Sequence, residues 1–136
     1  MQSKINPHSE AFTKNQTEML SLIEEFRTLE HNVRQASARQ KDRFTKRGQL
    51  LPRERLALLI DRGMPFIELS TLAGYKMHDD NGKKSIQGGS AIAGIAWVAG
   101  TRVMVYVHDS AIKGGAMSPM GVQKALRAQK VALENK

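Results

Sequence analysis

The sequence predicts an α/β fold in which a β-hairpin leads through a glycine loop into a helix. Apolar residues recur at helical spacing over residues 9–40, which indicates a long amphipathic helix. Two runs rich in β-forming residues flank the short connection 99–101, as in a hairpin. An apolar strand, a glycine pair and a helix start then follow one another over residues 103–119.

Length and charge limit the possible classes of protein. The chain has 136 residues, enough for one domain with a core, with 40% hydrophobic and 25% charged residues as in globular proteins. Its net charge of +8 makes polyanions plausible partners, whether nucleic acid, a membrane surface or a phosphate-rich ligand. No apolar run approaches the roughly 18 residues of a membrane-spanning helix.

Cysteine is absent, which excludes disulfides, thiolate nucleophiles and cysteine-ligated zinc. Residues 1–10 show neither the apolar core of a signal peptide nor an Arg-rich transit pattern. We therefore expect a cytoplasmic protein.

The long helix carries one apolar stripe: Met19, Leu22, Ile23, Phe26, Leu29 and Val33. A single helix cannot bury its own stripe, so we expect this face to lie either on another part of the chain or on a partner subunit. The basic segment 34–55 that follows is read as a solvated connector, with a nucleic-acid patch or an anion-binding rim as alternatives. Phe44 is its only aromatic residue, which argues against base stacking.

A second helix is predicted from Pro52, with Leu56, Leu59 and Ile60 on one face and Gly63 as its C-terminal stop. Residues 64–69 are predicted to form a short strand near a sheet edge. Residues 71–89 are expected to form an exposed excursion with its tip at 79–82, whose adjacent aspartates are read as solvated rather than as metal ligands.

The hairpin strands are predicted at 90–98 and 102–107, where small residues permit close backbone packing and Trp97 covers an edge of the core. A final helix is predicted at 119–134, and a strand is expected to follow residue 136. The residues expected to face inward on that helix are Val122, Ala125, Leu126 and Leu133.

Side-chain chemistry is sparse. The four histidines lack the spacing of a metal site, and His108 is expected to have a core or hydrogen-bonded structural role. No Walker, G-x-S-x-G or G-x-G-x-x-G motif occurs. Gly114 and Gly115 can take positive φ and expose backbone N–H groups, and Lys113 beside them is read as an anion contact. A simple turn and a phosphate or oxyanion site both fit this spacing.

Several blocks, in order, closely resemble the biotin-dependent acyl-CoA carboxylases, at the start of their carboxyltransferase (β) subunit. This group includes the methylcrotonyl-CoA, propionyl-CoA and geranyl-CoA carboxylases, and the resemblance covers nearly the whole chain from about Ser9. The blocks are Leu50-Leu51-Pro52-Arg53-Glu54-Arg55-Leu56, Pro65-Phe66-Ile67-Glu68-Leu69-Ser70, Leu72-Ala73-Gly74-Tyr75, Ser110-Ala111-Ile112-Lys113-Gly114-Gly115 and Leu126-Arg127-Ala128-Gln129.

The resemblance implies part of a crotonase-like (ClpP/crotonase) β-β-α fold with a long N-terminal helix. It implies a tail and helix over 1–45 and the first, incomplete part of a carboxyltransferase N-domain over 46–136. The implied activity is carboxyl transfer from carboxybiotin to an acyl-CoA, a ligase reaction. The implied substrate is a coenzyme A thioester bound between β subunits of a homo-oligomer. Biotin would be carried by a partner biotin carboxylase/biotin carrier (α) subunit.

The resemblance also implies site residues. Lys113, Gly114, Gly115 and Ala116 would lie near coenzyme A, whereas the oxyanion-binding amides of the family belong to segments that this chain does not include. No catalytic residue and no metal ligand is therefore expected within it. Many members have Thr-Tyr-Tyr where this chain has Ala116-Met117-Ser118, a departure that would open or soften the nearby wall. The pattern Ser110-Ala111-Ile112-Lys113 resembles the geranyl-CoA type more closely.

Two other interpretations remain open at this point. One is a small basic module that binds nucleic acid or another polyanion, recognisable by salt-dependent binding. The other is a truncated gene product without activity, since the expected oxyanion donors lie outside the chain.

Overall fold

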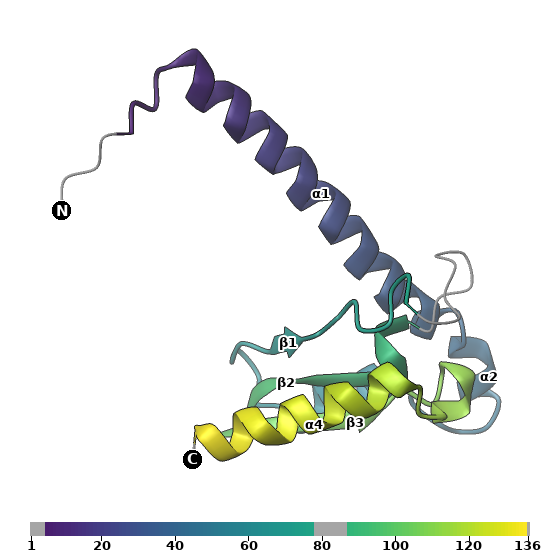
Figure 1. Ribbon diagram of the computed structural model, residues 1–136. Helices are drawn as coiled ribbons and strands as arrows, with labels where there is room; N and C mark the ends of the chain where they lie inside the picture. The colour runs from purple at the N-terminus through teal and green to yellow at the C-terminus, as the bar shows by residue number, and fades with distance from the viewer. Residues whose placement is uncertain (1–4, 78–86, 136) are drawn as a thin grey trace. The chain divides into compact units, whose positions relative to one another are not determined.

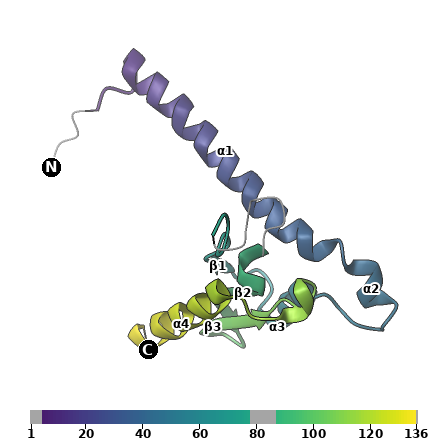
Figure 2. The same cartoon turned by 45° about the vertical axis from the view of Figure 1, so that its right-hand side comes forward.

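The computed structural model describes residues 5–77 and 87–135 (Figure 1). The chain divides into two units, Met1–Asn32 and Val33–Lys136. The first unit consists mainly of helix α1 (Glu10–Ala38), which continues into the second. Figure 2 shows α1 as one uninterrupted helix.

Helix α1 begins at a serine cap. The Phe12 amide donates a hydrogen bond to Ser9 Oγ at 3.2 Å, which satisfies one of the free N–H groups of the first turn. The predicted apolar stripe is present but largely exposed: Met19, Leu22 and Phe26 are each at least half exposed. Only towards its C-terminal end does the helix bury residues, at Val33 and Ser37.

The sheet has three antiparallel strands in the order β1-β2-β3: β1 (Ile67–Leu69), β2 (Ala91–Val98) and β3 (Thr101–His108). The predicted hairpin and the short strand at a sheet edge are both confirmed. Because Thr101 already pairs with Val98, the hairpin turn has only two central residues, Ala99 and Gly100. Both have positive φ, as in the tight turns typical of hairpins. A Cβ on Gly94 would collide with the carbonyl oxygen of Ile67, so close strand approach requires glycine there.

Helix α3 (Pro52–Leu59) packs on one face of this sheet, where Leu56 joins a core cluster with Ile92, Ala96 and Val105. Leu59, predicted to share a face with Leu56, is 52% exposed whereas Leu56 is buried. The helix ends at Leu59, and Ile60 is already extended, so Gly63 is not its stop. The short helix α2 (Lys41–Thr45) precedes α3 and buries Phe44.

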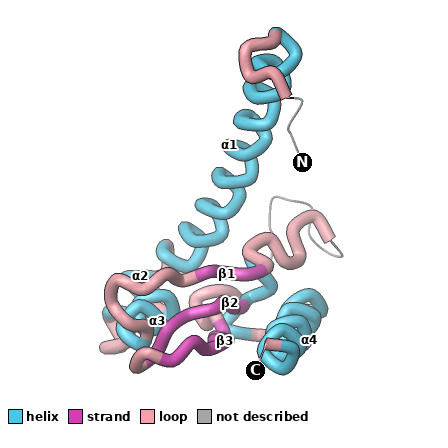
Figure 3. Tube along the Cα trace, turned by 90° about the vertical axis from the view of Figure 1, so that its left-hand side faces the viewer, coloured by secondary structure: helices cyan, strands magenta, loops and turns pink. Residues whose placement is uncertain are grey.

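Helix α4 (Pro119–Glu134) packs on the opposite face, as Figure 3 shows. Its cap was predicted correctly: Ser118 Oγ accepts the Gly121 amide at 3.0 Å. The predicted inward face was wrong, because Val122, Leu126 and Leu133 are exposed. The buried positions are instead Gly121, Lys124 and Ala128.

Backbone contact explains this rotation of α4. A Cβ on Gly121 would collide with the carbonyl oxygen of Gly89, and a Cβ on Gly89 would lie 3.0 Å from Gly121 Cα. The two backbones therefore touch, and only a face of small residues allows that approach.

The segment after β1 also differs from expectation. Thr71, Gly74, Gly88 and Gly89 are buried, so the ends of the expected exposed excursion belong to the packed part of the fold. Its predicted tip at 79–82 lies outside the described residues.

Candidate functional site

The predicted site follows β3 directly. Residues Lys113–Gly115 form one short 3-10 turn, η2, in which three consecutive residues have positive φ: Lys113 at 46°, Gly114 at 67° and Gly115 at 83°. A lysine in the left-handed region is uncommon and persists where surrounding contacts hold it. Lys113 and Gly114 are both exposed, so the ammonium group and the backbone of the turn face solvent.

Local hydrogen bonds use part of the backbone of this loop. The Gly115 amide donates to the Ile112 carbonyl at 2.9 Å, and the Ala116 amide donates to the Lys113 carbonyl at 3.2 Å. Two of the four predicted amides are therefore engaged inside the loop. The main charged group that the loop exposes is the Lys113 ammonium, which suits an anionic ligand.

Asp109 connects β3 to this loop from a buried position, where it is 2% exposed. Its Oδ1 accepts hydrogen bonds from Ser37 Oγ and from the Ala111 amide, both at 3.1 Å. Burial raises the pKa of its carboxyl, while the hydrogen bonds from Ser37 and Ala111 act in the opposite direction. The structural hydrogen bonds at this strand end are thus made by Asp109, the neighbour of His108.

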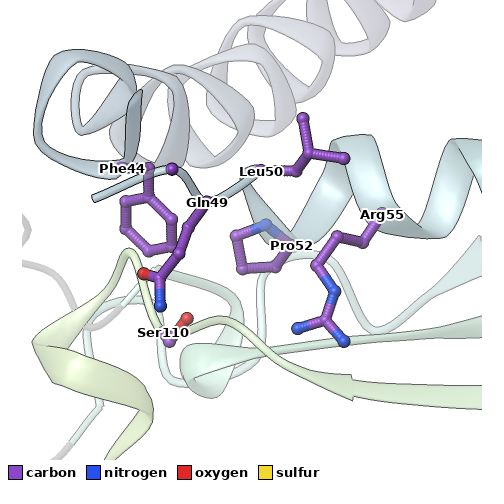
Figure 4. Close-up of a pocket in the computed structure, with 7 residues that line it drawn as sticks. Phe44, Gln49, Leu50, Pro52, Arg55 and Ser110 are labelled. Carbon is purple, nitrogen blue, oxygen red and sulfur yellow. The ribbon is translucent and has the colours of Figure 1, made fainter. Parts of the chain in front are cut away.

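An open pocket of about 350 Å³ lies beside the loop (Figure 4). Its floor includes Ser110, whose Cα would be 3.4 Å from a Cβ placed on Gly115, so pocket and loop are adjacent. The Gln49 side chain extends towards Ser110, while Arg55 lies beyond Pro52. The remaining lining residues are Phe44, Gly48 and Leu50. An amide, a hydroxyl and a guanidinium beside apolar walls suit a ligand with polar and anionic groups.

A second pocket, of about 420 Å³, lies between β3 and α4 and is more apolar. Two methionines, Met104 and Met117, line it together with Tyr106, His108, Gln129 and three alanines of α4. The His108 ring packs edge-on to Tyr106, with ring centroids 5.3 Å apart. His108 is exposed, so of the two roles expected for it, core or hydrogen-bonded, the core role is wrong.

The sequence did not predict three charged side chains that the structure places in buried or partly buried positions: Lys124, Arg53 and Glu68. Lys124 is 4% exposed, and its ammonium donates to the carbonyls of Ala91 at 2.7 Å and Gly88 at 3.2 Å. Burial is the main cause that lowers its pKa to about 8. Glu68 accepts two bonds from Arg53, at 2.7 and 2.9 Å. One signal was available: Lys124 shares a helix face with Gly121 and Ala128.

Within residues 5–77 and 87–135, no three His, Cys, Asp or Glu side chains gather as a metal site would require. Among the described helices, none has the length and apolar character needed to cross a membrane.

Comparison with known proteins identifies the family. The model of the carboxyl transferase domain matches residues 43–136. The chain belongs to the carboxyl transferase domain family. It is 37% identical, over its whole length, to the probable mitochondrial methylcrotonoyl-CoA carboxylase beta chain of Drosophila melanogaster. It is 44% identical, over 71% of its length, to the biotin-dependent 3-methylcrotonyl-coenzyme A carboxylase beta1 subunit of Mycobacterium tuberculosis.

Solved structures agree. The geranyl-CoA carboxylase beta subunit of P. aeruginosa superimposes with a TM-score of 0.87 and 50% identity over 99% of the chain. Transcarboxylase 12S, solved as a hexamer with methylmalonyl-coenzyme A bound, has a TM-score of 0.72 over 85% of the chain. At 19% identity this second match shows the fold alone.

The family resemblance and the partial crotonase-like carboxyltransferase fold with its long N-terminal helix are thus confirmed. The carboxyl transferase domain is present only in part, because the chain spans 23% of the Drosophila protein and 25% of the geranyl-CoA carboxylase subunit.

Proposed function

We propose that this chain is the N-terminal portion of a carboxyltransferase (β) subunit of a biotin-dependent acyl-CoA carboxylase. The complete subunit would transfer a carboxyl group from carboxybiotin to an acyl-CoA. The observation that carries the proposal is the match to the geranyl-CoA carboxylase beta subunit, at 50% identity over 99% of the chain. The same match, with the pattern Ser110-Ala111-Ile112-Lys113 before the glycines, favours a geranyl-CoA-like, long and branched acyl chain.

The role proposed for this portion is to hold coenzyme A. The exposed Lys113 ammonium, together with the backbone of Gly114, Gly115 and Ala116, would contact the ligand. The adjacent pocket with Arg55, Gln49 and Ser110 would receive its polar groups. The net charge of +8 supports attraction of a ligand that carries several phosphate charges.

A ureido oxyanion needs a pair of free backbone amides, and the Gly115 and Ala116 amides are not available for this because they donate to carbonyls within the loop. No catalytic step is proposed for the residues of this chain. Biotin is proposed to arrive on a biotin carboxylase/biotin carrier (α) partner subunit and to react at residues outside residues 1–136.

The assembly proposed is a homo-oligomer of β subunits with that α partner, in the cytoplasm. Residues 1–45 would supply the tail and helix, and residues 46–136 the first part of the N-domain. Size-exclusion chromatography with light scattering and cell fractionation test the assembly and the compartment.

The coenzyme A contact is tested by calorimetric titration of the chain with free coenzyme A. Lys113→Glu should weaken binding about tenfold, since it replaces an attractive charge by a repulsive one. Arg102→Glu makes the same charge change at the far end of β3 and is expected to leave the affinity nearly unchanged. Equal affinities of the Lys113→Glu and parent chains would contradict the contact.

A further inference from the structure

We propose that Asp109 is a positioning residue that fixes the conformation of the Lys113 loop, with Ser37 as its anchor. The importance of this arrangement for coenzyme A rests on the function proposed above. The arrangement of the loop itself does not, because it follows from contacts within the described residues.

Asp109 holds the start of the loop through both its backbone and its side chain. Its amide donates to the Ser90 carbonyl at 2.9 Å, and its carbonyl accepts the Ile112 amide at 2.9 Å. Its Oδ1 accepts from Ser37 Oγ and from the Ala111 amide. One residue thereby ties the strand end, the first loop turn and helix α1 together.

These contacts are closed to water. Asp109 is 2% exposed and Ser37 is 1% exposed. A hydrogen bond between buried groups has no solvent substitute when one partner is removed, so loss of the carboxylate would leave the Ala111 amide without its acceptor. Removing the Asp109 carboxylate should therefore cost more free energy than removing the same hydrogen bonds at the surface would.

The loop needs such a tether because its conformation is strained. Lys113 occupies the left-handed region without being glycine, and Gly114 and Gly115 follow at positive φ. Two hydrogen bonds close the loop, from the Gly115 amide to Ile112 and from the Ala116 amide to Lys113. Both come later in the chain than the first turn, which is closed by the bond from the Ile112 amide to the Asp109 carbonyl. A strained turn persists where fixed neighbours over-determine it, and Asp109 supplies the fixed end.

The hairpin offers a matched control at its other end. The Asp61 carboxylate also accepts two hydrogen bonds, in this case from the exposed backbone amides of Ala99 at 2.8 Å and Gly100 at 2.7 Å. Asp61→Ala therefore removes the same number of carboxylate hydrogen bonds at the opposite end of the hairpin. Any general weakening of the fold should appear in both variants, whereas loop positioning should respond to Asp109 alone.

The test measures amide hydrogen exchange of the 136-residue chain and, in parallel, titration with free coenzyme A. Asp109→Ala should speed exchange at Ile112, Gly115 and Ala116 about tenfold and weaken coenzyme A binding by a similar factor. Asp109→Asn keeps an acceptor oxygen and should restore both values towards those of the parent. Asp61→Ala should lower the melting temperature without changing either.

Unchanged exchange in Asp109→Ala, or an equal increase at these three amides in Asp61→Ala, would overturn the proposal. If Asp109→Ala does not fold, Ser37→Ala decides in its place: faster exchange at the loop amides supports the tether, and parental exchange refutes it. If the parent chain itself does not bind coenzyme A, the proposed function fails. The exchange measurement still decides the role of Asp109.

Discussion

At the scale of single residues, Lys124 shows how burial changes a charged group. Its ammonium lies between α4 and the backbone of residues 88–91, where it donates hydrogen bonds to the carbonyls of Gly88 and Ala91. Desolvation opposes its charge and lowers its pKa to about 8. At neutral pH Lys124 is thus charged and buried, which lowers the stability of the fold. Its hydrogen bonds connect α4 to the backbone of residues 88–91.

This cost predicts an unusual pH dependence. Below pH 8 both the folded and unfolded chains keep the Lys124 proton, and the penalty is complete. Between about 8 and the ordinary value of 10.5 the unfolded chain binds more protons than the folded one, so the free energy of unfolding rises with pH. Urea unfolding should show a gain of about 2 kcal/mol for this group between pH 7.5 and 9.5.

The control for that experiment is Lys124→Met, which keeps the length of the side chain but neither titrates nor donates. It should lack the rise that Lys124 contributes. It should also be less stable than the parent at pH 9.5 by about 1–3 kcal/mol, because the Gly88 and Ala91 carbonyls lose their donor. Identical pH profiles in the two proteins would show that Lys124 does not titrate in this range.

At the scale of elements, local patterns were sufficient where the determining contacts are local. The hairpin, the Ser118 cap and the long helix follow from spacing and turn chemistry within a few residues of the chain. The buried face of α4 does not. Hydrophobicity favours Val122 and Leu126, but the contact that sets the face joins Gly121 to Gly89, more than thirty positions apart.

The candidate site shows the same division. The glycine turn after β3 was predicted from sequence, since the glycines themselves indicate it. Asp109 was missed because its anchor, Ser37, lies 72 positions away and neither residue type indicates burial. The internal use of the Gly115 and Ala116 amides was missed because spacing does not reveal hydrogen-bond partners.

The α4 contact gives a direct prediction. Gly121→Ala should destabilise the chain by about 1–3 kcal/mol, because the added methyl would collide with the Gly89 backbone, and this outweighs the better helix propensity of alanine. Gln123→Ala, at an exposed position of the same helix, should be neutral or slightly stabilising. Thermal unfolding of both variants measures the difference. A Gly121→Ala chain as stable as the parent would mean that α4 is not seated on Gly89.

At the scale of the whole molecule, we predict that the purified chain does not carboxylate acyl-CoA. It spans about a quarter of the related subunits, and two amides of its loop, those of Gly115 and Ala116, already donate to carbonyls within the loop. The measurement is incorporation of labelled bicarbonate into geranyl-CoA with a biotin carboxylase/biotin carrier partner and ATP present. A complete subunit serves as the positive control, and steady incorporation by the 136-residue chain would contradict the prediction.

The exposed stripe of α1 has a thermodynamic consequence. Helices without packing partners are marginal in water, and over residues 10–32 the structure buries none of the large apolar side chains. The helicity of this segment should therefore vary with whatever occupies Met19, Leu22 and Phe26. Its melting would then be uncoupled from that of the sheet, and far-ultraviolet circular dichroism would record occupancy of the stripe as a gain in helical signal.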